Sequence, residues 1–307
     1  MLISQSHFET IKSAAFNLGF IACGITTAAI PIHHDSFELW LKAGKYGDME
    51  WLKNNFDIAK DPGTLLKGCN SVISLAYPYS SGSPVTPDGF KAARYSEPWH
   101  EDYHYRLKQK GKFLIKLLSE LCPGSKSRIC VDSAPIMERS FAVMSGIGFQ
   151  GKNTMLIIPG FGSWVYLAEI LTTAQYNPHQ AHILNGNCNG CEECLNNCPT
   201  GALEAPYLIN SAKCLSYITI EKKGDIRPDT GQYMGKCFLG CDRCQEVCPH
   251  NTKTEDLISI PSTDELLEMK EEEFNLIFGK TSLKRAGLSK IISGIRAIKF
   301  PSEPEKV

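Results

Sequence analysis

Residues 188–248 hold nine of the chain's 13 cysteines, and this concentration limits what that part of the chain can fold into. The segment is rich in turn residues and shows no sustained helical or strand periodicity. It therefore cannot bury enough apolar surface to form a core of its own. A bound inorganic group is the usual substitute for such a core, and the spacing of the cysteines indicates which one.

The cysteines form two runs, each ending in Cys-Pro, with Cys214 between them. The first run reads C-x2-C-x2-C-x3-C-P, the spacing of bacterial ferredoxins with [4Fe–4S] clusters, in which the fourth cysteine binds the other cluster. This ferredoxin rule predicts one ligand set of Cys188, Cys191, Cys194 and Cys248 and a second set of Cys198, Cys214, Cys241 and Cys244. Cys237 belongs to neither set, although it could replace Cys214 or Cys241.

Two other uses of the cysteines fit less well. Zinc sites usually combine C-x2-C pairs across longer loops, which three consecutive close cysteines do not match. Disulfides are a weaker alternative, because the N-terminus carries no export signal and the cytoplasm keeps thiols reduced. The start of the chain instead predicts an amphipathic helix through Phe8, Ile11 and Ala15, with Ser6 and Glu9 as a capping box. We expect a cytoplasmic protein without a membrane-spanning segment.

The region before the cysteines alternates strand and helix patterns and predicts an α/β (α+β) domain over residues 1–183. Expected helices are 101–121 and 135–146, the second with Pro135 near its start, and 79–89 is expected to be a surface loop. A ferredoxin-like domain is expected over 184–255 and C-terminal helices (263–278 and 282–299) over 256–307. Apolar runs predict strands at 20–26, 71–79, 127–132, 154–159 and 164–173.

Common cofactor motifs do not identify what the clusters would reduce. No G-x-G-x-x-G follows a strand, so a dinucleotide site is unsupported. The segment DYHYRL at 102–107 lacks the glycine of the corrinoid motif D-x-H-x-x-G and opens a helix. His104 is therefore interpreted as a helix-start histidine rather than a metal ligand.

Longer sequence runs carry a more specific signal. The chain resembles the epoxyqueuosine reductase family over residues 1–300, with the same cysteine spacings in matching order. The resemblance implies a nitroreductase-like, corrinoid-binding domain joined to a ferredoxin-like domain. It also implies cobalamin, two [4Fe–4S] clusters and reductive removal of the epoxide oxygen of epoxyqueuosine in tRNA. The runs that carry it are VDSAPIMERSFAVMSGIGFQGKNTMLI (131–157), GSWVYLAEILT (162–172), CNGCEECLNNCPTGAL (188–203), CLSYITIE (214–221) and GCDRCQEVCPHN (240–251).

The same resemblance implies roles for individual residues. Asp132 matches the proton donor, for which we expect a pKa raised by burial. An ordinary helix N-cap, formed by Asp132 or Ser133, is the alternative. The glycine-flanked segment 152–154 matches a loop beside the corrinoid, although it could be an ordinary turn. The cobalamin-contacting residues implied are Tyr95, Asp132, Lys152, Asn153, Thr154, Leu156 and Ser216.

The partners implied are tRNA and an external low-potential electron donor, with the protein acting as a monomer. A net charge of −1 means that tRNA would need a local basic patch. The helix 282–299 and the segment 221–227 are candidates, although a basic helix face is often only solvated. The candidate cations are Lys222, Lys223, Lys284, Arg285, Lys290 and Arg296.

Two other functions remain open at this point. One is another corrinoid iron–sulfur reductase, of the dehalogenase kind, although those enzymes normally carry an export signal. The other is an electron-transfer protein without a corrinoid, for which Asp132 would have no catalytic role. The resemblance also predicts a short form that lacks the C-terminal helical-repeat segment of many family members.

Overall fold

The computed structural model describes residues 1–79, 82–177, 184, 186–252 and 256–302. The chain divides into two compact units, each built from segments distant in the sequence. Unit 1 comprises 1–44, 50–78 and 104–190, and unit 2 comprises 45–49, 79–103 and 191–307. The three-part division expected from the sequence stays a prediction. The segments 45–49 and 79–103 belong to the same compact unit as most of the cysteine-rich part of the chain.

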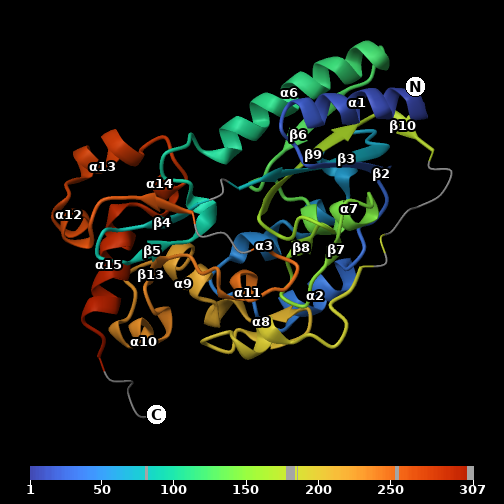
Figure 1. Ribbon diagram of the computed structural model, residues 1–307. Coiled ribbons are helices and arrows are strands. Elements are labelled where there is room, and N and C mark those ends of the chain that lie inside the picture. Colours follow the sequence, from blue (N-terminus) through green and yellow to red (C-terminus); the bar gives the residue numbers. More distant parts are fainter. Residues whose placement is uncertain (80–81, 178–183, 185, 253–255, 303–307) are drawn as a thin grey trace. The chain divides into compact units, whose positions relative to one another are not determined.

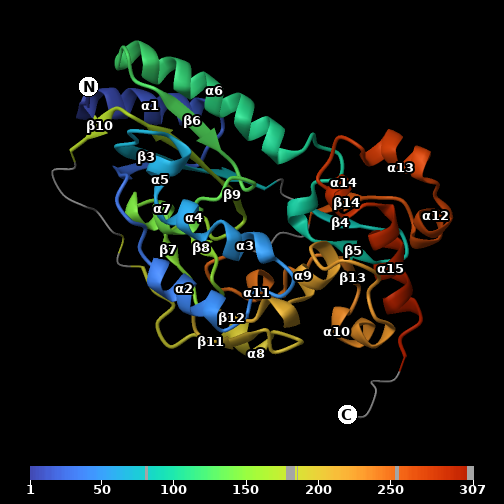
Figure 2. The same ribbon diagram turned by 180° about the vertical axis from the view of Figure 1, so that it is seen from behind.

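Unit 1 is built on one four-stranded sheet in which every neighbouring pair is antiparallel. The order is β2 (Ala22–Thr27), β3 (Ser71–Pro78), β9 (Val165–Thr172) and β6 (Ser127–Cys130). These bounds confirm the four predicted strands. Helices α1 and α6 cover one face and α7 covers the other (Figures 1 and 2), which explains why β3 and β9 read as nearly continuous apolar runs.

The two helices on the first face begin close to where the sequence places them. Helix α1 (Gln5–Asn17) is capped by Ser4, whose Oγ accepts the His7 amide at 3.1 Å, so the predicted capping box at Ser6 is wrong. Helix α6 (Tyr103–Leu121) packs through Leu107, Leu114 and Leu118. Gly111 is required there, because a Cβ would lie 2.5 Å from Ile129 Cδ1.

On the other face, α7 (Glu138–Met144) begins three residues later than expected. Met137 is the N-cap, so Pro135 lies outside the helix and neither Asp132 nor Ser133 caps it. The reason is local: residues 132–136 form tight bends before the helix begins. The predicted strand 154–159 is only the two-residue β8 (Leu156–Ile157), paired with β7 (Phe149–Gln150) in a hairpin.

Short elements complete unit 1. A parallel pair joins β1 (Leu2–Ile3) to β10 (Gln175–Tyr176). Four short helices follow β2, and the sequence patterns did not predict them. They are α2 (His34–Lys42), α3 (Glu50–Asn54), α4 (Phe56–Lys60) and α5 (Pro62–Leu65).

Unit 2 has a small mixed sheet of its own. Its order is β13 (Cys237–Leu239), β5 (Lys91–Ala92), β4 (Ser83–Val85) and β14 (Leu257–Ser259). The pairs β13–β5 and β14–β4 are parallel, and β4–β5 is antiparallel. The prediction that 79–89 is only a loop is therefore wrong. Its strand was missed because it pairs with residues about 170 positions later.

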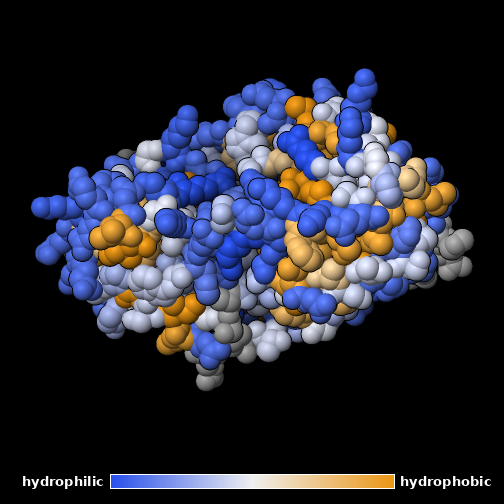
Figure 3. Space-filling model, turned by 90° about the horizontal axis from the view of Figure 1, so that it is seen from above, coloured by the Kyte–Doolittle hydropathy of each residue, from blue (hydrophilic) through white to orange (hydrophobic). Residues whose placement is uncertain are grey.

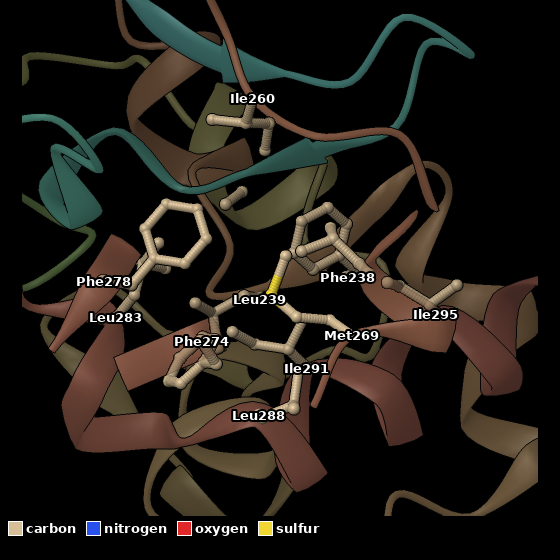
Figure 4. Close-up of a cluster of buried hydrophobic side chains, with 12 residues drawn as sticks. Phe238, Leu239, Ile260, Met269, Phe274, Phe278, Leu283, Leu288, Ile291 and Ile295 are labelled. Carbon is tan, nitrogen blue, oxygen red and sulfur yellow. The ribbon is translucent and has the colours of Figure 1, made fainter. Parts of the chain in front are cut away.

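The core of unit 2 packs the C-terminal helices against this sheet (Figure 4). Phe238 and Leu239 of β13 meet Phe274 and Phe278 of α13 (Glu271–Phe278). The two predicted helices are both broken: α12 (Thr263–Glu268) ends before Lys270, and Gly287, at φ 78°, separates α14 (Leu283–Ala286) from α15 (Leu288–Lys299). The cysteine-rich segment contributes β13 to this core, although it has no apolar core of its own.

The surface of the chain is mainly polar. Hydrophilic side chains interrupt the apolar patches on the face shown in Figure 3. Phe16 of α1 and Phe113 of α6 are among the exposed aromatic residues. Within the part of the chain that the structure describes, no helix combines the length and apolarity needed to cross a bilayer.

Candidate iron–sulfur and proton-donor sites

The two cysteine runs form the same local structure within unit 2. Each gives a four-residue helix, α8 (Glu193–Asn196) in the first run and α11 (Arg243–Glu246) in the second, and these two helices pack together. Cys194 lies on α8 and Cys244 on α11. The repeated local structure follows from the repeated C-x2-C-x3-C-P spacing, which closes a tight turn in both runs.

Cys198, Cys214 and Cys244 lie near Cys241 or near one another, as their effects on pKa show. Burial, to which the charges of Cys214 and Cys198 add, raises the pKa of Cys241 to about 11. Burial also raises the pKa of Cys244 well above its usual value, again with Cys241 and Cys214 as contributors. Four half-buried thiols gathered in this way would resist ionising together unless a cation compensated them, and iron would supply that compensation. The residues present therefore fit a [4Fe–4S] cluster.

Backbone amides point at several of the sulfurs. The Ala202 amide donates to Cys198 Sγ at 3.2 Å. The amides of Tyr217 and Ser216, at the start of α9 (Leu215–Ile220), donate to Cys214 and lower its pKa against the effect of burial. Such N–H···S bonds favour the thiolate, which is the form that binds iron.

Cys237 differs from the predicted ligands. Its Sγ donates to the carbonyl oxygens of Leu239 at 3.3 Å and Gly240 at 3.5 Å. Burial raises its pKa strongly, as it does for Cys241 and Cys244, so the two contacts with carbonyl oxygens are what distinguish it. This supports leaving it out of the ligand sets, which stay a prediction.

The other predicted set includes Cys191, Cys194 and Cys248 in unit 2, with Cys188 three residues before Cys191 at the end of unit 1. The Lys152 amide donates to Cys188 Sγ at 3.5 Å within unit 1. Among the described residues, no three His, Cys, Asp or Glu side chains converge to hold a single metal ion. A cubane does not need such convergence, because each thiolate binds a different iron.

Asp132 lies two residues beyond the end of β6, as the sequence placed it. Its side chain is 42% exposed, so the burial expected to raise its pKa is not present in this structure. One carboxylate oxygen, Oδ2, lies 2.9 Å from His104 Nε2 in the first turn of α6. Asp132 also has a positive φ of 50°, a conformation that non-glycine residues rarely adopt.

A chain of contacts joins Asp132 to the loop between β7 and β8. Glu138, the first residue of α7, accepts the Asp132 amide through Oε1 at 2.6 Å. The next residue, Arg139, donates to the Thr154 carbonyl oxygen at 2.6 Å and to Thr154 Oγ1 at 3.2 Å. The structure thus brings Asp132 and Thr154, two of the residues predicted to surround a corrinoid, to the same end of α7.

The remaining predicted corrinoid residues have varied surroundings. Asn153 is buried, and its Oδ1 accepts the Met155 amide at 3.2 Å. Leu156 packs in an apolar cluster and is 2% exposed, so a cofactor could meet only its main chain. Tyr95 and Ser216 are half-buried residues of unit 2.

Three of the six predicted tRNA-binding cations have contacts within unit 2. Lys290 is buried and donates to the Gly224 carbonyl oxygen at 2.5 Å, which makes it unsuitable for a phosphate. Arg285 pairs with Glu221 at 2.7 Å, and Lys284 bonds to Asn275. These contacts show that three of the basic side chains serve contacts within the protein. Lys223 and Arg296 are exposed, and Lys222 is half-buried.

His104 contacts Asp132, and the sequence did not predict this contact. The missing glycine of the corrinoid motif bears on a metal-ligand role alone and not on a contact with another side chain. The available signal was its place in the first turn of a helix. Its partner lies 28 residues later, and no local pattern connects the two.

Together these features define an iron–sulfur oxidoreductase with an α+β domain that carries an exposed carboxyl group. Residues 187–251 match the family model described as a 4Fe-4S double cluster binding domain. Residues 60–133 match the model described as epoxyqueuosine reductase QueG, DUF1730. The chain is 35% identical to an epoxyqueuosine reductase of Cyclobacterium marinum, covering 92% of this chain and 93% of that protein. It is 32% identical to one of Cellulophaga algicola, covering 96% and 100%. The chain belongs to the epoxyqueuosine reductase family.

Solved structures give the same result. An epoxyqueuosine reductase with a tRNA-Tyr epoxyqueuosine-modified stem loop superposes with a TM-score of 0.82 at 28% identity, over 94% of this chain and 80% of that one. The Bacillus subtilis enzyme, captured with its catalytic aspartate loop swung out of the active site, gives 0.82 at 27% over the same shares. The predicted family, fold class and double-cluster domain are confirmed.

Proposed function

We propose that this chain is an epoxyqueuosine reductase that removes the epoxide oxygen of epoxyqueuosine in tRNA to give queuosine. The observation that carries the proposal is the 35% identity to a curated enzyme of that activity over nearly the whole chain. A solved relative that holds an epoxyqueuosine-modified tRNA stem loop supports tRNA as the substrate. Family membership favours this function over a dehalogenase or a simple electron carrier.

The reaction requires a source of electrons and a source of protons. Releasing the epoxide oxygen as water consumes two electrons and two protons. Two [4Fe–4S] clusters would carry the electrons, held by the cysteine sets described above. Cobalamin, when bound, supplies a strongly reducing cobalt centre that takes these electrons to the epoxide. Asp132, Lys152, Asn153, Thr154, Tyr95 and Ser216 are the residues we propose to surround it, with the main chain of Leu156.

Asp132 is the proposed proton donor to the departing oxygen. Its carboxyl group is exposed, so a substrate can reach it, and His104 fixes the orientation of Oδ2. The Bacillus subtilis relative, whose catalytic loop is named by an aspartate and is swung out of the active site, supports this assignment. We propose that the electron donor is an external low-potential protein. We also propose that the enzyme works in the cytoplasm, where tRNA is modified, and that it acts as a monomer.

The test uses protein reconstituted without oxygen, with iron, sulfide, cobalamin and a strong reductant. It is incubated with tRNA containing epoxyqueuosine, the tRNA is digested, and the masses of the nucleosides are measured by mass spectrometry. Loss of one oxygen from the modified nucleoside is expected. Asp132→Asn should retain iron and cobalamin but lose at least about 100-fold in rate, in line with a general acid. Unchanged nucleoside with both cofactors bound would reject this substrate.

A further inference from the structure

The Asp132 loop holds its proton donor in an unfavourable backbone conformation. Asp132 is one of few non-glycine residues with positive φ, at 50°, and it lies two residues past β6, before α7 begins. Such a conformation persists only where surrounding contacts impose it. One contact that reaches the main chain of Asp132 is the hydrogen bond from its amide to Glu138 Oε1, 2.6 Å long.

Glu138 is well suited to accept that amide without adding charge. It is half-buried, and burial followed by the charge of Asp132 raises its pKa to about 8, against the lowering effect of the Asp132 amide and of Arg139. At neutral pH it is therefore largely protonated, and its carbonyl oxygen still accepts the amide. A glutamine has the same shape and the same acceptor, which makes it a close replacement.

A second carboxyl group, that of Glu169, lies on the strand against which α7 packs. It is fully buried on β9, between Ser74 on β3 and Cys130 on β6, which are its direct partners across the sheet. Neither of its carboxyl oxygens has a hydrogen-bond partner among the described residues. A carboxyl group in such surroundings must be neutral, and even then its burial is costly.

The helix that begins with Glu138, α7, packs against the strand that carries Glu169, β9. Burial raises the pKa of Glu169, and the charge of Glu138 and hydrogen bonding with its side chain add to that effect. The contact lies outside good hydrogen-bond geometry, because neither Glu169 oxygen has a partner by strict distance and angle. Burying the Glu169 carboxyl group without a partner is unfavourable. Its presence is explained if it supports Glu138, which holds the Asp132 loop.

We propose that Glu138 is the positioning residue of the Asp132 loop, and that the neutral carboxyl group of Glu169 supports it from the sheet. Glu138 accepts the Asp132 amide and thereby holds the proton donor in its strained conformation, where His104 can orient the side chain. Glu138 takes no proton from the substrate and is not a catalytic residue. This inference rests on the proposed function for its effect on turnover, but not for its effect on the loop.

The first test measures the loop directly. Hydrogen exchange is followed by mass spectrometry in reconstituted holoenzyme, in peptides that contain the amide of residue 132. Glu138→Ala should exchange at least about five-fold faster at that amide, because its hydrogen bond is lost. Glu138→Gln should exchange like the wild type. Glu271→Ala is the matched control, since Glu271 is also the exposed first residue of a helix, α13.

The second test measures turnover of epoxyqueuosine in tRNA. Glu138→Ala should lower kcat about 10- to 100-fold with little change in KM for tRNA, because the donor is misplaced but the substrate still binds. Glu138→Gln and Glu271→Ala should stay within about two-fold of wild type. Wild-type kcat in Glu138→Ala, or equal losses in the Ala and Gln variants, would overturn the proposal.

Glu169 is tested by separating stability from function. Glu169→Leu removes a buried polar group without a partner, so its melting temperature should be equal to or above that of the wild type. Its exchange at residue 132 should nevertheless be faster and its kcat lower. A Glu169→Leu variant with wild-type exchange and turnover would remove Glu169 from the proposal. If the wild type leaves epoxyqueuosine unchanged, the proposed function fails, and the exchange at residue 132 still decides the role of Glu138.

Discussion

The predicted cluster ligands of unit 2 lie close together in the sequence, whereas the side chains around Asp132 in unit 1 come from separate elements. Six of the seven ligands in unit 2 fall in two runs with nearly identical spacing. Around Asp132, His104 comes from α6, Glu138 from α7 and Glu169 from β9. One region is organised by a bound inorganic group and local turns, and the other by the packing of a sheet and helices.

This difference predicts which parts tolerate change. Thiolates around a cluster are bound covalently to iron, so one lost ligand removes a whole cofactor. The Asp132 region is held by hydrogen bonds, each of which has a modest effect on stability. A single substitution there should leave the fold intact and act on the rate of proton transfer.

The largest effect is expected from a cysteine of the second predicted set. Cys241→Ser should reduce the iron content from about eight to about four per chain and abolish turnover, because one cluster is lost. Cys237→Ser is the matched control, since Cys237 donates its proton to backbone carbonyls and stays a thiol. Iron analysis and the visible absorbance of the clusters give the result. The ligand sets would be wrong if Cys237→Ser lost iron and Cys241→Ser did not.

A smaller effect is expected from the histidine that faces Asp132. His104→Ala removes the 2.9 Å contact with Oδ2 and should lower kcat about 10-fold, with iron and cobalamin content unchanged. His104→Gln places an amide nitrogen near the position of Nε2 and should recover much of that loss. Single-turnover rates on modified tRNA measure both. Equal rates for the wild type and His104→Ala would show that the contact does not orient the donor.

The sequence predicted the double-cluster domain because the cysteine spacing is local, and the family model over residues 187–251 confirms that domain. Spacing and the Cys-Pro endings also assign eight ligands and leave Cys237 out, and that assignment stays a prediction. The four strands of unit 1 were also predictable, since β3 and β9 are covered on both faces and read as apolar runs. The place of Asp132 after β6 followed from the same pattern and from the family resemblance.

What could not be predicted depends on contacts between distant residues. The strand at Ser83–Val85 exists because residues 257–259 pair with it. The break at Gly287 and the burial of Lys290 depend on how α15 packs, which a helical periodicity does not reveal. The partners of Asp132 were missed for the same reason. Hydropathy also gave no sign that Glu169 is fully buried, because a carboxyl group in an apolar strand pattern reads as an exposed position.

The smallest effect is expected from an ion pair within unit 2, because a polar contact near the surface adds little to the stability of the fold compared with the clusters. Glu204 bonds to Lys45, to Asn210 Nδ2 at 3.0 Å and to Lys213 Nζ at 3.0 Å. The hydrogen bond from Lys45, followed by those from Asn210 and Lys213, lowers the pKa of Glu204 to about 2. Its carboxylate therefore stabilises the fold above the unfolded-state pKa of about 4.3, and this contribution is lost as the pH falls toward 2.

Glu204→Gln should consequently lower the melting temperature at pH 7 by no more than about a few degrees, since the group is near the surface and screened by water. The difference from the wild type should shrink as the pH is lowered from 6 toward 3.5 and as salt is added. Glu268→Gln is the matched control, because Glu268 is an exposed carboxylate at the end of α12 in the same unit. Thermal denaturation followed by circular dichroism measures the series. A difference that grew on acidification would contradict the assigned pKa direction, and a loss of iron in Glu204→Gln would show that this ion pair supports the cluster region after all.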